Sequence, residues 1–597
     1  MNGDERKQAL SSVRFAALGM VTLCAALLLD WAISDGEVAV PPVMASAPRV
    51  LEPVESDEDR LRPGPERDLR GRTLTNRAAY IPPQCYTATE TETGDAANPC
   101  FTCHVMPRSP NFVIDHDLQL EHAFPEYARE NHWTNLFEDR SEAVAAIDDA
   151  TIDAYVAVSN YTDADGGLTL ARVLADVPAG WDFDGDGRWG GYVPDAYFDF
   201  DDQGFDRDPS GSPTGWRAFA YVPTPGTFWP TNGSMGDALI RLPPAFRSDQ
   251  TGAFDRSVYV TNLAIVEALI RRRDVAIEPT DEAALGVDLD KDGELGTARV
   301  VAYEWAPLRG KTMSYVGQAK AALEAGEVHL AAGLFPEGTE FLHTVRYLGI
   351  TEGGVAWGPR LKELRYTRKR AWWSYSELEA RAGDEVKEKD DFPDRLRQLA
   401  GTGDVEHGIG NGQGWVYQGF IEDARGELRP QTFEEQVFCV GCHGGVGVTD
   451  DGIFSFGRKV GADGFQRGWS HPSQRGLEGM AEPLRADGLG EYAHYLQTAR
   501  AGDELRANDE VIERFFEDGE PRPEALAALS EDIGTLLLPS PERARLLSKA
   551  YLAIVREQDF TEGRDATVTP PANLHRSLDT DSRPTGVAEP ILPRWHP

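Results

Sequence analysis

The chain has 597 residues, enough for two or three domains, and 41% of them are hydrophobic, which supports folded cores. It is strongly acidic, with 98 Asp and Glu against 59 Lys and Arg and a formal net charge of −39. This balance argues against a nucleic acid or an anionic lipid surface as the partner.

Residues 1–34 are predicted to be a signal peptide or signal anchor. Phe15–Leu29 is a nearly unbroken apolar run with basic residues before it and acidic residues after it, which exports everything that follows. Extended to Ile33 it just spans a membrane, so we expect an uncleaved anchor, with cleavage after Ala45-Ser46-Ala47 as the alternative. Leu23 precedes Cys24, and because Leu23 is not small we predict no lipoprotein site. The protein is therefore expected in the periplasm or another extracytoplasmic space, anchored to the inner membrane by its N-terminal helix.

Residues 35–78 are rich in proline and charge and are predicted to be a flexible linker. The next region, 79–150, contains the pentapeptide Cys100-Phe101-Thr102-Cys103-His104. Two thiols three positions apart on one helical turn can reach the two vinyl groups of one porphyrin, and the following histidine can bind its iron. We predict a first haem region here.

Residues 151–385 lack this motif and are predicted to form a mixed α/β insert. Strands are expected over 328–330, 340–347 and 354–357. Helices are expected over 258–272 and 374–387.

Two loops in the insert match D-x-D-x-D-G. Alternate carboxylates on a tight turn converge on one point, which favours a hard cation such as Ca²⁺. Both loops depart from the EF-hand pattern, because Val193 and Arg299 stand at position twelve, where a bidentate Glu belongs. Solvated acidic turns are the alternative. The candidate calcium ligands are Asp182, Asp184 and Asp186 in the first loop and Asp288, Asp290 and Asp292 in the second.

Residues 386–565 contain the second pentapeptide, Cys439-Val440-Gly441-Cys442-His443, and helical patterns over 490–500 and 523–555. Residues 566–597 are predicted to be a C-terminal tail. Zinc knuckles and redox dithiols are alternatives for the two pentapeptides, but neither requires a histidine directly after the second cysteine.

The two C-x-x-C-H motifs make the chain resemble the c-type cytochromes, as a di-haem member. The resemblance implies two covalently bound haem c groups, held by Cys100, Cys103, Cys439 and Cys442, with His104 and His443 as proximal iron ligands. The fold class expected is α+β, with mainly helical, cytochrome-c-like haem regions on either side of the mixed insert.

The sixth iron ligand decides the chemistry of each haem. His471 and His343 are candidate distal ligands. An iron whose sixth position is filled by a side chain transfers electrons, whereas an iron whose sixth position is open catalyses. We expect single-electron transfer between redox partner proteins in a respiratory or photosynthetic chain. The alternatives are an extracytoplasmic haem oxidoreductase, such as a di-haem peroxidase or an oxygenase, and a structural or sensing module.

Overall fold

The computed structural model describes residues 69–87, 124–223, 236–397, 403–444, 449–459, 476–477, 479–484, 488–499, 508–572 and 574–578, all within the compact unit Leu61–Pro597. Several predictions fall outside these residues. They are the N-terminal segment 1–34, most of the linker, the first haem motif with Cys100, Cys103 and His104, the candidate ligand His471, and the end of the tail.

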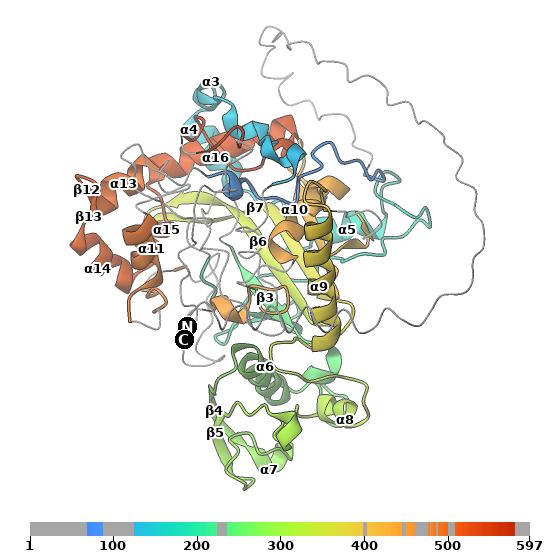
Figure 1. Ribbon diagram of the computed structural model, residues 1–597. Helices are drawn as coiled ribbons and strands as arrows, with labels where there is room; N and C mark the ends of the chain where they lie inside the picture. The colour runs from blue at the N-terminus through green and yellow to red at the C-terminus, as the bar shows by residue number, and fades with distance from the viewer. Residues whose placement is uncertain are drawn as a thin grey trace, which may run out of the picture. The chain divides into compact units, whose positions relative to one another are not determined.

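A nine-stranded antiparallel sheet forms the centre of the described fold (Figure 1). The strand order is β1-β2-β3-β6-β7-β10-β9-β8, and β11 also pairs with β10. The strands are β1 (Phe205–Arg207), β2 (Pro213–Ala218), β3 (Ala238–Arg241), β6 (Glu340–Thr351), β7 (Gly354–Lys369), β8 (Gly403–Asp404), β9 (Gly408–Gly410), β10 (Trp415–Glu422) and β11 (Leu428–Pro430).

The long hairpin β6–β7 dominates this sheet, and both of its faces are covered. Leu342 and Leu364 pack on one face in a cluster with Phe420, whereas Phe341 packs on the other with Tyr417. Because successive strand residues point to opposite faces, both sets of side chains are buried where the sheet is covered on both sides. Several of these buried residues are charged, among them Arg346, Lys362 and Glu363.

Helices cover the sheet from several parts of the chain. α6 (Arg256–Arg271) is buried along most of its length and packs beside the hairpin of β4 (Val275–Asp281) and β5 (Thr297–Val301). α16 (Pro541–Glu557) packs on β6 and β7 together with α3 (Ser141–Ala145) and α4 (Asp149–Val156) (Figure 1). The other helices are α5 (Thr169–Ala175), α7 (Glu282–Leu285), α8 (Gln318–Glu324), α9 (Tyr375–Asp391), α10 (Phe433–His443), α11 (Glu491–Ala499), α13 (Asp509–Phe515), α14 (Pro523–Glu531) and α15 (Gly534–Leu537).

The fold class expected from the sequence is wrong. The region after residue 386 is not a mainly helical, cytochrome-c-like unit, because it supplies β8 to β11 to the central sheet. β10 pairs with β7 from Trp415↔Lys369 to Ile421↔Glu363, so the expected insert and the expected haem region share one sheet. A motif of five residues specifies a helical turn and its chemistry, but it carries no information about the fold around that turn.

The individual elements were predicted with mixed success. The strand expected over 340–347 is confirmed and continues to Thr351, and the one expected over 354–357 is the start of the much longer β7. The helix expected over 258–272 corresponds to α6, and that over 374–387 to α9, with Ser374 as its N-cap. The strand expected over 328–330 is wrong, since those residues follow α8 in an irregular segment.

Candidate functional site

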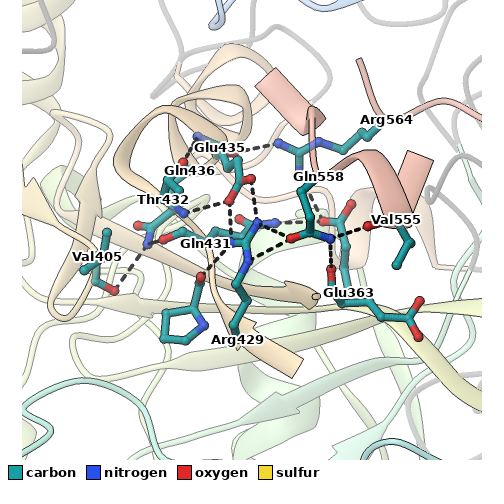
Figure 2. Close-up of polar contacts among 12 residues, drawn as sticks. Glu363, Val405, Arg429, Gln431, Thr432, Glu435, Gln436, Val555, Gln558 and Arg564 are labelled. Carbon is teal, nitrogen blue, oxygen red and sulfur yellow. Dashed lines mark hydrogen bonds and ion pairs between the residues drawn. The ribbon is translucent and has the colours of Figure 1, made fainter. Parts of the chain in front are cut away.

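The second C-x-x-C-H motif forms the last turn of α10, and a buried polar network fixes the first turn of that helix (Figure 2). Thr432 is the N-cap and forms a capping box with Glu435, which satisfies backbone N–H groups that a helix start leaves without partners. Arg429 binds both carboxylate oxygens of Glu435, at 2.8 and 2.9 Å. Arg564 donates to the backbone carbonyl of Glu435 at 2.8 Å, and Gln558 accepts from Arg429.

These partners keep the buried Glu435 carboxylate ionised. Burial alone would raise its pKa, but the attraction and hydrogen bonds of Arg429, with the backbone N–H of Thr432, outweigh burial and lower the pKa. On the other flank of the helix start, the Glu434 carboxylate accepts the backbone N–H groups of Thr75 and Asn76. The helix is therefore anchored by segments that lie far from it in the sequence.

Close packing explains the glycine inside the motif. A Cβ atom on Gly441 would lie 1.9 Å from the carbonyl oxygen of Tyr80, so only glycine allows α10 to approach the Tyr80 backbone. The opposite side of this turn carries Cys439, which packs against the core cluster that contains Phe341 and Tyr417. Both cysteines of the motif are half-buried and are thiols in the structure.

His443 is oriented by one hydrogen bond. Its Nδ1 lies 2.8 Å from the carbonyl oxygen of Gly452, and because a carbonyl only accepts, Nδ1 carries the proton. In the neutral ring Nε2 then holds the lone pair, the state in which imidazole binds a metal. Burial lowers the pKa of His443 to about 4, so the ring is neutral at pH 7. Tyr417 and Phe454 pack against it, with ring centroids 4.9 and 5.1 Å away.

The Gly452 carbonyl is itself held by a tight turn. Asp450 and Ile453 exchange backbone hydrogen bonds, and the two residues between them have φ of 55° and 77°, the left-handed geometry of a two-residue hairpin turn. The Asp451 side chain forms an ion pair with Lys369 of β7, both 1% exposed. Burial raises the pKa of Asp451 and lowers that of Lys369, and their mutual attraction opposes both effects.

The structure brings the candidate ligand His343 to the same region. His343 lies on β6 directly across from Arg365 of β7. Burial is the larger cause of the lowered pKa of His443, and charge repulsion from Arg365 and His343 lowers it further. Arg365 also lowers the pKa of the Cys439 thiol, although burial raises that pKa overall.

The first Asp-rich loop has the predicted geometry. One carboxylate oxygen each of Asp182, Asp184 and Asp186 lies within 4.8 Å of the others. The Asp182 carboxylate accepts the backbone N–H groups of Gly185 and Gly187 at 2.8 and 2.9 Å, which closes the turn.

The second loop differs from its prediction. Asp288 and Asp290 converge with Glu282, the first residue of α7, whereas Asp292 is outside this group. Glu282 is fully buried and accepts the backbone N–H groups of Leu289 at 2.5 Å and Gly296 at 2.9 Å. Sequence reasoning missed Glu282 because it precedes the loop, where the EF-hand pattern has no ligand.

Among the residues that the structure describes, no helix has both the length and the hydropathy needed to cross a lipid bilayer. The apolar segment Phe15–Leu29 is outside those residues.

Comparison with known proteins corrects the resemblance drawn from the two motifs. A family model described as a "-like lipoprotein" matches residues 70–525. An uncharacterized lipoprotein of Aquifex aeolicus (strain VF5) is 31% identical over 536 residues, which cover 82% of this chain and 86% of the relative. No solved structure matches.

The match overturns the assignment to the c-type cytochromes, because it extends over most of the chain whereas the resemblance rested on two pentapeptides. It also replaces the description as a transmembrane protein with that of a lipoprotein. An extracytoplasmic location, expected from the N-terminal charge pattern, agrees with this family. The chain belongs to this family of lipoproteins.

Proposed function

We propose that this lipoprotein binds haem covalently at α10 and passes single electrons between redox proteins outside the cytoplasm. The observation that carries the proposal is the last turn of α10, where Cys439, Cys442 and His443 stand together and the Gly452 carbonyl holds Nδ1 of His443. A haem at this site would supply an iron that changes between two oxidation states.

The residues around the motif fit such a group. The two thiols are half-buried, and the neutral His443 offers Nε2 as a ligand. Tyr417 and Phe454 provide aromatic surface beside the ring, and Arg365 provides a cation that suits the acidic edge of a porphyrin. The alternative of a zinc site is less well supported, because the ligand atoms of Cys439, Cys442 and His443 do not converge within 4.8 Å of one another; among the described residues the two groups that do so consist of carboxylates only.

The test is covalent haem in the full-length protein, purified from a host that attaches haem outside its cytoplasm. After acid–acetone extraction, the wild type should retain one haem for each motif, measured by pyridine haemochrome spectra and intact mass. Replacement of both Cys439 and Cys442 by alanine should remove one haem. The matched control is Cys85→Ala, the third cysteine that the structure describes, which should keep both. A wild type without covalent haem contradicts the proposal.

We also propose that the two Asp-rich loops bind Ca²⁺. The converging carboxylates of Asp182, Asp184 and Asp186, and the completion of the second cluster by the buried Glu282, support this proposal. The affinity expected is weak, as in other extracellular calcium modules.

The finer location that we propose is the outer face of the inner membrane. The basic residues before Phe15–Leu29 support an N-terminus that stays on the cytoplasmic side during export. Separation of the two membranes on a density gradient tests this, and recovery with the outer membrane contradicts it.

A further inference from the structure

Two imidazoles in the described fold are anchored in the same way. His343 Nδ1 lies 3.1 Å from the backbone carbonyl oxygen of Asp237, and His443 Nδ1 lies 2.8 Å from that of Gly452. In both rings Nδ1 must therefore donate, and Nε2 lies on the side away from the anchor. Histidine ligands of metals commonly have their second nitrogen held by a backbone carbonyl or carboxylate in this manner.

Each anchoring carbonyl is fixed by a buried ion pair. Asp237 binds Arg346 at 2.7 Å, and its carboxylate is fully buried. The preceding Gly236 lets this segment approach β6, since a Cβ there would lie 1.6 Å from the carbonyl oxygen of Thr344. On the other side, the Asp451–Lys369 pair holds the turn that carries Gly452. These buried ion pairs fix the carbonyl groups, and the carbonyl groups in turn fix the direction of each imidazole, as is typical of metal ligands.

The strand register and one ring contact place the two histidines on the same face of the sheet. His343 pairs with Arg365, and Arg365 pairs with Gly419 of β10, so these three residues form one row across the sheet. Tyr417 precedes Gly419 by two positions, points to the same face, and packs its ring on His443. Neighbouring strands are about 4.8 Å apart, so His343 on β6 lies roughly 10 Å across the sheet from Gly419 on β10, and His443 of α10 packs over the β10 side of this face.

This face is also suited to a porphyrin. The ring centroid of Tyr221 lies 6.4 Å from that of His343, and Phe341 is buried on the same face two residues before His343. Arg365, which lies between His343 and Gly419 in the row, adds a positive charge to this face.

We infer that His343 is the second axial ligand of the haem at α10, so that this iron is closed by two histidines. The inference rests on the proposed haem attachment. His471, the other candidate, is outside the described residues and is the competing ligand in the test below.

The experiment uses the full chain with Cys100 and Cys103 replaced by alanine, so that only the α10 haem remains. In this background, His343→Ala should keep its covalent haem, while the iron changes from low spin to high spin in absorption and EPR spectra. The reduced variant should bind carbon monoxide, and added imidazole should restore the low-spin spectrum. His343→Met should stay low spin with a higher reduction potential, which also shows that the site tolerates substitution.

The matched control is His407→Ala, because His407 is 42% exposed and its Nδ1 is bound by the Asp404 side chain, away from the row described above. Its spectrum should equal that of the background. A His343→Ala protein that stays low spin, a background protein that already binds carbon monoxide, or a high-spin change caused by His471→Ala alone would each overturn the inference. Absence of covalent haem from the background protein would instead contradict the proposed function.

Discussion

Replacement of Glu435 by glutamine should strongly destabilise the protein, because it leaves Arg429 buried without its counter-charge. Arg429 is 4% exposed and Glu435 is fully buried, and the two form a bidentate pair. Removing one partner of a buried ion pair costs about 3 to 5 kcal/mol. Glutamine keeps the shape and one acceptor oxygen for Thr432, so we expect about 3 kcal/mol, which lowers the folding equilibrium constant roughly a hundredfold or more.

The assay is urea-induced unfolding at 25 °C and pH 7, followed by tryptophan fluorescence, with the slope compared between variants. The pH dependence checks the cause. The folded-state pKa of Glu435 is lowered, so its contribution is present above the unfolded-state pKa and is lost as pH falls through the folded-state value. The difference between wild type and variant should therefore shrink in acid. Asp391→Asn is the control, since its pair with Lys387 is exposed and should contribute nothing measurable. A shift for Glu435→Gln no larger than that of the control would refute the reasoning.

Two further predictions concern the calcium loops and the motif glycine. Added Ca²⁺ should raise the melting temperature, because a ligand at a hundred times its Kd stabilises the folded state by about 2.7 kcal/mol. Replacement of Asp184 and Asp186 by alanine, or of Glu282 by glutamine, should reduce this rise. A wild-type melting temperature that changes with neither calcium nor chelator would favour solvated turns. Gly441→Ala should lower both stability and haem content, since its Cβ would meet the Tyr80 carbonyl. Gly383→Ala in α9, where a Cβ meets nothing within 4 Å, should leave haem content unchanged and stabilise the helix by up to about 1 kcal/mol. Equal effects of the two alanines would contradict the packing argument.

The sequence allowed local structure to be predicted where one residue pattern was sufficient. The motif around Cys439 and Cys442 predicted a helical turn that ends in a histidine, and β6 and α6 followed from apolar periodicity. Two strands of the sheet were missed because β8 and β9 are two or three residues long and contain glycine, a pattern typical of loops.

The parts of the fold and of the candidate site that were not predicted depend on contacts between residues far apart in the sequence. Glu282 joins the second acidic cluster only because α7 folds back onto the loop, and the row from His343 to Gly419 exists only through strand pairing. No spacing rule links those positions. The family that the two C-x-x-C-H motifs suggested was wrong, and the haem attachment that they predict stays a prediction.

The polar network at the start of α10 also bears on the order in which parts of the chain fold. Gln558 binds Arg429 from 129 residues away, and Arg564 reaches Glu363 across 201 residues. Contacts of such separation form late, after most of the chain has left the ribosome and crossed the membrane. The first turn of α10 therefore receives these contacts only when the C-terminal segment docks. Under the proposed haem attachment, the two thiols at the other end of α10 stay accessible to an attaching enzyme until then, and a chain truncated before Gln558 should keep them accessible throughout.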